Sequence, residues 1–235
     1  MLAELPQALA DAAGLELARY REAHVRERVR RAVEREQVTG VGGLARRLQA
    51  DPGARVRFRR SVAVSVSGLF RDSEQFELLE RELLPPFVAR GGKIRAWSAG
   101  CADGPELYSV AMVLDRAGAL ERSFLLGSDL LEENLAAARA GTGFGSDSSA
   151  AIRRRLRWEQ RDLLRDGPAP GKWHVILCRN VAIYFSQEAK DTLHAQLASS
   201  LARGGVLLLG RSERVSNAAR FGLEDVGPHA YRRLA

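Results

Sequence analysis

Cysteine, aromatic residues and long apolar runs are all scarce in this chain of 235 residues. Its 2 cysteines, Cys101 and Cys178, lie in apolar stretches, so we expect no disulfide framework and a reducing, cytoplasmic location. No apolar run approaches the ~20 residues that a membrane-spanning helix needs. The N-terminus carries Glu4 and Asp11 and has no basic leader, so a signal peptide is not expected. These absences favour a globular protein with a hydrophobic core and no membrane span.

Several kinds of catalytic and binding machinery are also missing from the sequence. The histidines are dispersed without metal-ligand spacing and are expected to be structural: His24, His174, His194 and His229. No Ser-His-Asp set is evident, and no glycine loop is followed by the Lys-Ser/Thr pair of a P-loop. Aromatic residues make up 6% of the chain, and no N/D-P-P-Y/F motif is present, which argues against nucleic acid as a partner.

Positive charge is concentrated near the N-terminus. Residues 1–60 hold 13 arginines and 8 acidic residues, a difference of +5 within a net charge of +7. This segment shows no strand-like alternation and is expected to be helical, with Val25, Val29 and Val33 forming a buried stripe. A second stripe on another face is basic, and it comprises Arg21, His24, Arg28, Arg31 and Arg35. That stripe predicts either a docking face for an acidic partner or an ordinary solvated surface.

Alternating strand and helix patterns begin at Lys93. Strands are expected at residues 94–98, 124–128, 156–160, 173–178 and 206–209, followed by a hairpin of residues 223–226 and 230–233. Helices are expected at residues 106–117, 131–140 and 187–202, the last of them ended by Gly204-Gly205. This order predicts an α/β fold with a mostly parallel sheet, helices on both faces and an antiparallel terminal strand.

Turn residues suggest where two helices stop. Asp51-Pro52-Gly53 predicts a turn, and Pro85-Pro86 predicts the end of a helix over residues 73–84. Gly141 is expected to cap the helix that precedes it.

A glycine loop and an acidic residue follow the first two strands of the expected sheet. Gly100 and Gly104 flank the first loop, and Asp129 ends the second strand. An acid at that position is placed to accept both hydroxyls of a ribose. Because phosphate-binding machinery is absent, the pattern favours a nucleoside without a phosphate tail, and S-adenosylmethionine fits that description. The other interpretation of Asp129 is an N-cap for the helix that begins at Leu131.

Several ordered segments carry a family resemblance. They are LFRDSEQFELLERELLPPF, KIRAWSAGCADGPELYSVAMVL, LLGSDLLEENLAAARAG, the terminal YRR and WHVILCRNVAIYFSQEAKDTLHAQLASSLARGGVLLLGRSE. Together they resemble the chemotaxis-receptor methyltransferases, the CheR family, over nearly the whole chain. The last segment contains the family's CRN-x-x-IYF signature and a match to its GHSE element.

The resemblance implies a class I S-adenosylmethionine-dependent methyltransferase fold preceded by a small all-helical domain. The implied parts are a helical domain with a basic docking face at residues 1–63, a linker with the FRD helix at 64–90 and the methyltransferase domain at 91–235. The implied reaction is methyl transfer to glutamate side chains on cytoplasmic helices of chemoreceptors, with S-adenosylhomocysteine as the product. The alternative partner is a protein other than a chemoreceptor that presents an acidic surface.

The resemblance also implies roles for individual residues. Arg71 and Tyr184 would act at the reacting centre, with Tyr184 supporting the wall of the cleft. The residues implied to contact the cofactor are Ser65, Ser67, Arg71, Gly100, Glu106, Asp129, Asp162, Leu163, Asn180 and Val181. The basic stripe would face the acidic receptor helices.

Three departures from the family pattern bear on activity. Ser65 stands where the family has a cofactor-contacting asparagine, and Pro105 replaces the first glutamate of G-E-E-P-Y-S. Residues 141–159 are too few for the β-subdomain that most members insert there, so docking through a pentapeptide tether is not expected. These departures leave a second hypothesis open: a catalytically weakened regulator of a chemosensory-like pathway that binds S-adenosylmethionine or S-adenosylhomocysteine.

Overall fold

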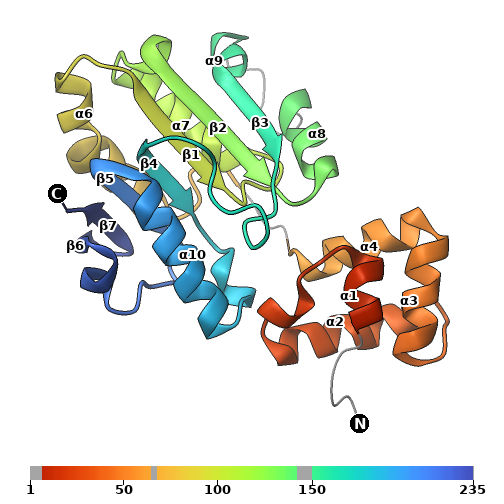
Figure 1. Ribbon diagram of the computed structural model, residues 1–235. Helices are drawn as coiled ribbons and strands as arrows, with labels where there is room; N and C mark the ends of the chain where they lie inside the picture. The colour runs from red at the N-terminus through yellow and green to blue at the C-terminus, as the bar shows by residue number, and fades with distance from the viewer. Residues whose placement is uncertain (1–6, 65–67, 142–149, 235) are drawn as a thin grey trace. The chain divides into compact units, whose positions relative to one another are not determined.

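The computed structural model describes residues 7–64, 68–141 and 150–234 (Figure 1). Its contacts divide the chain into two units. The first, the helical unit, comprises residues 1–65 with residues 184–190. The second, the sheet unit, comprises residues 66–183 and 191–235.

The helical unit is built around four α-helices. These are α1 (Gln7–Ala13), α2 (Glu22–Arg35), α3 (Gly40–Ala50) and α4 (Pro52–Val62), with a short 3₁₀ turn at Leu17–Arg19. The predicted helical character is confirmed, but the buried stripe of α2 is different from the expected one. Val25 and Val29 are buried together with Ala32, while Val33 is only half-buried. The stripe turns by one residue because a helix of 3.6 residues per turn drifts away from a strict four-residue repeat.

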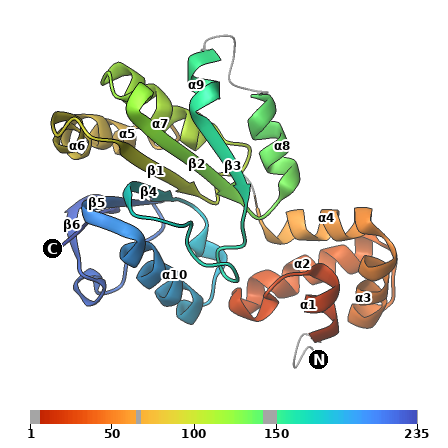
Figure 2. The same cartoon turned by 45° about the horizontal axis from the view of Figure 1, so that its top comes forward.

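The sheet unit contains one seven-stranded sheet in the order β3-β2-β1-β4-β5-β7-β6 (Figure 2). The strands are β1 (Ile94–Ala99), β2 (Ser123–Asp129), β3 (Leu156–Gln160), β4 (Trp173–Cys178), β5 (Leu201–Leu209), β6 (Leu223–Gly227) and β7 (Ala230–Arg233). The first five run parallel, and β7 is antiparallel to both of its neighbours. The predicted sheet with an antiparallel terminal strand is therefore confirmed.

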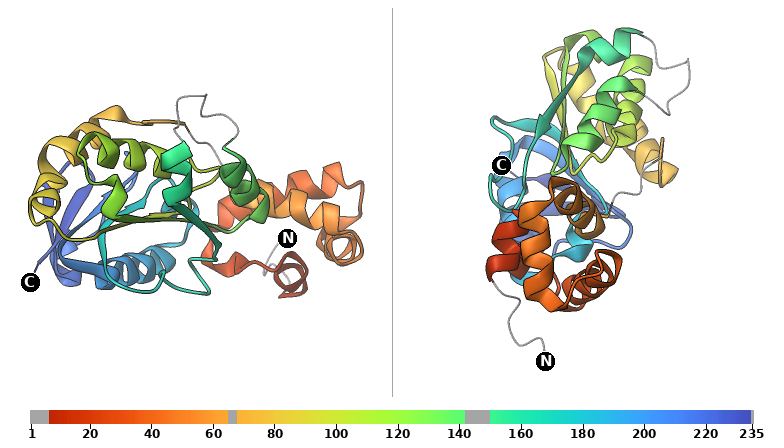
Figure 3. Two further views of the ribbon diagram at one scale, coloured as in Figure 1. Left: turned by 90° about the horizontal axis from the view of Figure 1, so that it is seen from above. Right: turned by 90° about the vertical axis from the view of Figure 1, so that its right-hand side faces the viewer.

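Helices cover both faces of the sheet. They are α5 (Ser73–Leu78), which continues into a π-helical turn at Leu79–Leu83, α6 (Pro85–Ala89), α7 (Pro105–Arg116), α8 (Glu132–Ala140), α9 (Ala150–Arg155) and α10 (Gln187–Ser200). In the left view of Figure 3, α7 and α8 lie on one side of the sheet and α10 on the other. The core on the α7 side joins Phe76, Leu107 and Leu114 to strand residues such as Leu125 and Val175.

Both predicted proline turns are the starts of helices. Pro52 begins α4, where the Asp51 carboxylate accepts a hydrogen bond from the Gly53 N–H at 2.8 Å. Pro85 begins α6 directly after the π-helical turn. Proline lacks an N–H that the first helical turn does not need, and its fixed φ suits that position. The expected stops are confirmed, because the helical segment from Ser73 ends at Leu83 and Asp51 separates α3 from α4, but a new helix begins at each proline.

Two glycine expectations have different outcomes. Gly141 caps α8 with a φ of +66°, as predicted. Gly204 and Gly205 lie inside β5, which begins at Leu201 rather than at Val206. The strand starts earlier because Leu201 pairs with Trp173 of β4 ahead of an irregularity in the register.

Between α8 and β3, the described residues form α9 and no strand. Residues 142–149 of this connection lie outside the described ranges. Across residues 7–64, 68–141 and 150–234, no helix is both long and apolar enough to cross a membrane.

Candidate functional site: the cleft beside the glycine loop

The glycine loop lies between β1 and α7 and is shaped by close packing. Gly100 and Cys101 both donate backbone hydrogen bonds to the Ser128 carbonyl of β2, at 2.8 and 2.9 Å. Gly100 has a φ of +78°, and a Cβ there would lie 2.5 Å from a methyl carbon of Val181. Gly104 has a φ of +98°, and its Cβ would lie 2.7 Å from the Trp158 ring. Both positions therefore require glycine for conformation and for space.

Asp129 joins the end of β2 to the glycine loop. Its Oδ2 accepts a hydrogen bond from the Ala102 N–H at 2.9 Å, and its Oδ1 accepts from Leu131 N at 2.9 Å and Asn134 Nδ2 at 3.0 Å. The side chain is buried, and burial raises the pKa of its carboxyl. A carboxylate has about four acceptor positions. Asp129 therefore braces both the start of α8 and the glycine loop, and its described hydrogen bonds use three of those positions.

A small cavity opens at the carboxyl ends of β1 and β4. These two strands are adjacent in the sheet. The strands that follow β1 in sequence lie on one side of it, and β4 lies on the other, so the strand order reverses between β1 and β4. Open α/β sheets bind their ligands at such a reversal. The cavity is lined by Gly68, Arg71, Gly100, Cys101, Ala102, Glu106, Arg179 and Asn180. Four of the residues predicted from the sequence are among them: Arg71, Gly100, Glu106 and Asn180. Cys101 is buried, and burial raises the pKa of its thiol well above the usual value, so it packs and is not a nucleophile.

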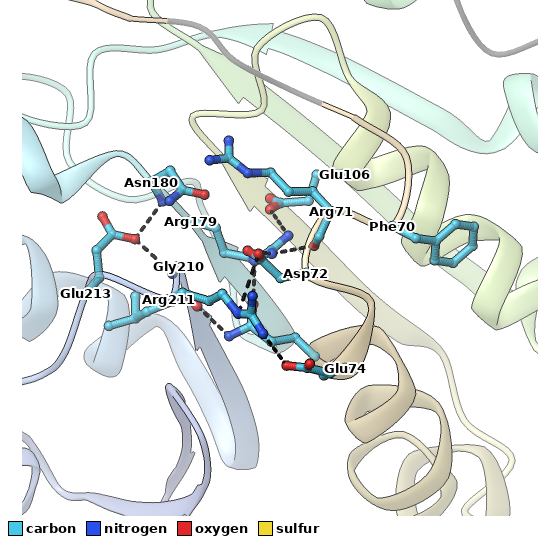
Figure 4. A network of polar contacts seen from close by, with 12 residues as sticks. Phe70, Arg71, Asp72, Glu74, Glu106, Arg179, Asn180, Gly210, Arg211 and Glu213 are labelled. Carbon is cyan, nitrogen blue, oxygen red and sulfur yellow. Dashed lines mark hydrogen bonds and ion pairs between the residues drawn. The ribbon is translucent and has the colours of Figure 1, made fainter.

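Arg179 is the centre of a buried polar network at this cavity (Figure 4). Its side chain is 3% exposed, and its guanidinium lies over the Phe76 ring at 5.3 Å. It donates hydrogen bonds to Gln75 Oε1 at 2.7 Å and to Glu106 Oε2 at 3.2 Å. Sequence reasoning missed Arg179, although an arginine directly after the apolar strand WHVILC was a usable signal.

Glu106 connects this network to the start of α7. Its Oε1 accepts a hydrogen bond from the Ser98 hydroxyl at 2.6 Å, and Oε2 faces Arg179. Burial raises the pKa of this carboxyl, against the opposing effect of Arg179. Pro105, which precedes it, is the first residue of α7, and its carbonyl accepts a hydrogen bond from Ser109 Oγ at 2.9 Å. The departure at Pro105 therefore leaves the helix start and Glu106 in good geometry.

Glu213 shapes the loop after β4. Its Oε2 accepts hydrogen bonds from Asn180 N at 2.6 Å and Gly210 N at 2.8 Å. Its Oε1 accepts from Val181 N at 3.0 Å and Ile183 N at 3.2 Å. The residue is buried, and Asn180 is held at a φ of +60°. Glu213 was also missed, and its signal was a carboxylate four residues beyond the apolar strand VLLL.

The remaining predicted cofactor contacts are spread more widely. Val181 packs on Gly100, and Asp162 and Leu163 follow β3, where Arg161 N donates to the Asp129 carbonyl at 2.9 Å. The Asp162 side chain accepts from Leu164 N at 2.9 Å, so it stabilises its own turn. Ser65 and Ser67 lie outside the described residues.

Tyr184 belongs to the helical unit. Its carbonyl accepts a hydrogen bond from Arg21 N at 2.9 Å, and its ring lies 4.8 Å from that of His24. The cavity-lining residues, by contrast, all belong to the sheet unit. The described contacts of Tyr184 are thus with Arg21 and His24, and its role at the reacting centre stays a prediction.

The basic stripe of α2 is less uniform than its sequence spacing indicates. His24 is half-buried, and its Nε2 lies 3.0 Å from the Val62 carbonyl, while burial lowers its pKa. Arg31 pairs with Glu27, and Arg35 pairs with Glu36. Arg21 is exposed and Arg28 is half-buried. The positive charge of this face therefore comes from Arg21 and Arg28 more than from the full stripe.

The residues at the cavity suit S-adenosylmethionine. Its ribose needs hydrogen-bond acceptors, and the Asp129 carboxylate lies against the glycine loop, where it accepts from the Ala102 N–H. Its sulfonium and amino groups are cationic, and Glu106 presents a carboxylate whose burial a cation would offset. The cofactor would therefore be held by Glu106, the glycine loop and Asn180, which line the cavity, while Asp129 lies behind the loop and outside that lining.

The strand order and the cleft define a class I S-adenosylmethionine-dependent methyltransferase. The family model described as the CheR methyltransferase, SAM binding domain, matches residues 65–149 and 143–226, about two thirds of the chain. The chain belongs to the CheR methyltransferase family.

Two curated relatives are similar over most of their length. A chemotaxis protein methyltransferase of Listeria monocytogenes is 30% identical, over 93% of this chain and 91% of its own. Chemotaxis protein methyltransferase 1 of Pseudomonas aeruginosa is 30% identical, over 87% of this chain and 86% of its own.

Among solved structures, the magnesium protoporphyrin IX methyltransferase of Synechocystis with bound SAM is 16% identical with a TM-score of 0.44. It covers 74% of this chain and 86% of its own length. A likeness at this level is too distant to bear on substrate or mechanism.

Proposed function

We propose that this protein transfers methyl groups from S-adenosylmethionine to glutamate side chains of chemoreceptor-like signalling proteins in the cytoplasm. The observation that carries the proposal is that Arg71, Glu106, Asn180 and the glycine loop line one cavity at the switch point of the sheet. The names of the two relatives, chemotaxis protein methyltransferases, support the class of substrate.

The chemistry needs alignment more than proton transfer. The bound cofactor supplies a methyl carbon attached to a cationic sulfonium, which is open to in-line displacement. The substrate carboxylate is already ionised near pH 7, so no strong general base is required. A guanidinium such as that of Arg71 can align this carboxylate through a charge-assisted, bidentate pair. The protein's contribution is then proximity and orientation.

Replacing the aligning arginine tests this proposal. Arg71→Ala is expected to lower turnover by about 100-fold, because alignment of the nucleophile carries most of the rate, while affinity for S-adenosylhomocysteine changes little. The measurement is methyl incorporation into cytoplasmic receptor fragments, with calorimetry for the cofactor. Arg81→Ala is the matched control, since Arg81 is exposed on the π-helical turn and does not line the cavity.

The type of product tests glutamate as the acceptor. Methyl esters of carboxylates are hydrolysed by alkali to methanol, whereas methylated nitrogen is stable. We expect the incorporated methyl group to be released as methanol, and a stable product would exclude carboxyl methylation. Tight cofactor binding with no transfer to any receptor would instead favour the regulator, the second hypothesis that Pro105 and Ser65 raise.

The helical unit is the proposed receptor contact. Reversing charge at Arg28, Arg31 and Arg35 is expected to weaken receptor binding and leave cofactor affinity unchanged, because those residues lie on α2 and outside the cavity. The matched control reverses three exposed arginines elsewhere in the same unit: Arg26, Arg46 and Arg60. Arg26 lies on the opposite side of α2 by helical geometry. Equal loss in both triple variants would reject this face as the docking surface.

A further inference from the structure

A chain of alternating charges runs from the cavity to the surface of the sheet unit. Glu106 pairs with Arg179 at 3.2 Å, and Arg179 pairs with Asp72 at 2.7 Å. Asp72 faces Arg211 at 3.6 Å, and Arg211 pairs with Glu74 at 2.5 Å. The Asp72 carboxylate therefore lies between two guanidinium groups, one buried and one exposed (Figure 4).

The backbone around Arg71 has a conformation that needs external support. Phe70 has a φ of +49° and Asp72 a φ of +56°, so residues in the left-handed region flank Arg71 on both sides. Such a residue costs about 1–3 kcal/mol and persists only where its surroundings impose it. As Figure 4 shows, the side chains of Phe70 and Arg71 point in opposite directions from this turn.

Three contacts hold the turn in place. Ser109 Oγ accepts a hydrogen bond from the Phe70 N–H at 2.8 Å. Arg179 Nη2 donates to the Arg71 carbonyl at 2.5 Å and to the Asp72 carboxylate at 2.7 Å. Arg179 thus binds the backbone of Arg71 and the side chain of its neighbour through one nitrogen.

The geometry requires arginine at the buried position. Four N–H groups of Arg179 reach four acceptors: the Gln75 amide, Glu106, the Arg71 carbonyl and Asp72. Lysine has a single nitrogen with three donors and cannot span this set. Asp72 in turn compensates the Arg179 charge, which would otherwise be poorly paired in a buried site.

We propose that Asp72 is a positioning residue for methyl transfer, clamped by Arg179 and Arg211 so that the turn presents the Arg71 side chain to the cavity. The inference rests on the proposed function of Arg71 and extends it to the residues that set the turn. Asp72 does not line the cavity, whereas its neighbour Arg71 does, so the proposed role of Asp72 is to position Arg71.

Replacing the clamped carboxylate is the central experiment. Asp72→Asn is expected to lower kcat by about 10-fold to 100-fold, because a misplaced aligning group loses rate steeply. Affinity for S-adenosylhomocysteine, measured by calorimetry, is expected to stay within about 2-fold. Arg211→Ala is expected to have a smaller effect, since Arg211 is 57% exposed and its interaction is screened by water and salt. Glu74→Gln is the control, because it removes only the exposed pair between Glu74 and Arg211.

A double-variant comparison separates positioning from general destabilisation. If Asp72 acts through Arg71, Asp72→Asn is expected to cause no further loss of kcat in the Arg71→Ala background. Full additivity of the two losses would overturn the proposal.

Hydrogen exchange of the peptide covering residues 69–76 provides a second readout that needs no substrate. We expect faster exchange in Asp72→Asn and in Arg211→Ala, and wild-type exchange in Glu74→Gln. If wild-type protein transfers no methyl group, the proposed function fails, and the exchange result still tests whether Arg179 and Arg211 hold the turn through Asp72. Unchanged exchange in Asp72→Asn would reject it.

Discussion

The helical unit and the sheet unit hold their carboxylates in opposite ways. In the helical unit, Glu27 lies at the surface between Arg30 and Arg31, whose hydrogen bonds lower its pKa to about 2. In the sheet unit, Glu106 and Asp129 are buried, and burial raises the pKa of both. Surface pairs are screened and tolerate substitution. Buried carboxylates cost free energy and are expected where they hold a precise geometry.

Glu36 is intermediate between these two cases. Its side chain is 4% exposed, yet its partners Arg57, Arg35 and Arg47 are about half-exposed. The hydrogen bond from Arg57, followed by that from Arg35, lowers its pKa to about 2. Partners of opposite charge therefore outweigh burial at Glu36, whereas burial outweighs the hydrogen bonds at Asp129.

The largest effect is expected at Glu213, a buried carboxylate of the sheet unit. Glu213→Ala leaves four backbone N–H groups without their acceptor, and we expect it to lower the free energy of unfolding by about 3 kcal/mol or more. Urea denaturation measures this change. Glu34→Ala in the helical unit is the control, since Glu34 is exposed and pairs only with Arg30 among the interactions described. Similar losses at the two sites would contradict the distinction between buried and surface carboxylates.

Replacing a glycine of positive φ by alanine in each unit compares how closely other atoms pack around the backbone there. Gly40 and Gly100 both have positive φ, but a Cβ meets nothing at Gly40 and meets Val181 at 2.5 Å at Gly100. We expect Gly40→Ala to lower the free energy of unfolding by about 1 kcal/mol and Gly100→Ala by about 2–3 kcal/mol. Urea denaturation measures both. Adding Val181→Ala to Gly100→Ala should recover the difference, and no recovery would place the cost elsewhere.

Cofactor affinity tests the role of Asp129. Asp129→Asn is expected to weaken S-adenosylhomocysteine binding by about 10-fold, because it replaces one charged acceptor beside the glycine loop. Titration calorimetry measures the loss. Glu36→Gln, which alters the corresponding buried carboxylate of the helical unit, is expected to leave this affinity unchanged. Wild-type affinity in Asp129→Asn would reject the ribose role.

The smallest effect is expected in the pH dependence of the two units. The pKa of Glu36 is lowered on folding, so its contribution to stability is present above about pH 4.5 and is lost as the pH falls toward 2. The pKa of Asp129 is raised, so its contribution is present below about pH 4 and is lost as the pH rises through its folded pKa.

Hydrogen exchange resolved by peptide measures these opposite trends in the intact chain. Because intrinsic amide exchange itself slows on acidification, the quantity compared is the protection factor at each pH. Acidification below about pH 4.5 should lower protection in the helical unit, and Glu36→Gln should weaken that dependence. In the sheet unit, protection should fall as the pH rises through the folded pKa of Asp129, and Asp129→Asn should weaken that fall. Parallel pH trends in the two units would contradict the assignment of causes.

The periodicity of the sequence was sufficient for most of the fold. The apolar run at residues 173–178 matched β4 at every residue, because a buried strand leaves a continuous hydrophobic signal. The expected strand at residues 156–160 matched the bounds of β3, although LRWEQ is mostly polar and only Leu156 is buried. The glycine loop and Asp129 were found from their positions after consecutive strands. The expected helix stop at Gly204-Gly205 was wrong, since these residues pass through β5 where Leu201 pairs with Trp173 of β4. The prolines did mark helix ends, but the sequence did not show that each also begins a new helix.

The sequence by itself determined the alternation of strands and helices along the chain, the loop, the acid after β2 and the family to which the chain belongs. Only the tertiary structure showed that Arg179 and Glu213 organise the cleft, because their acceptors and donors come from segments up to 108 residues away. It also showed that Asp129 holds both the glycine loop and the start of α8 and that the basic stripe is partly neutralised. Local patterns report which residues are buried, whereas the partner of a buried charge depends on how distant segments meet.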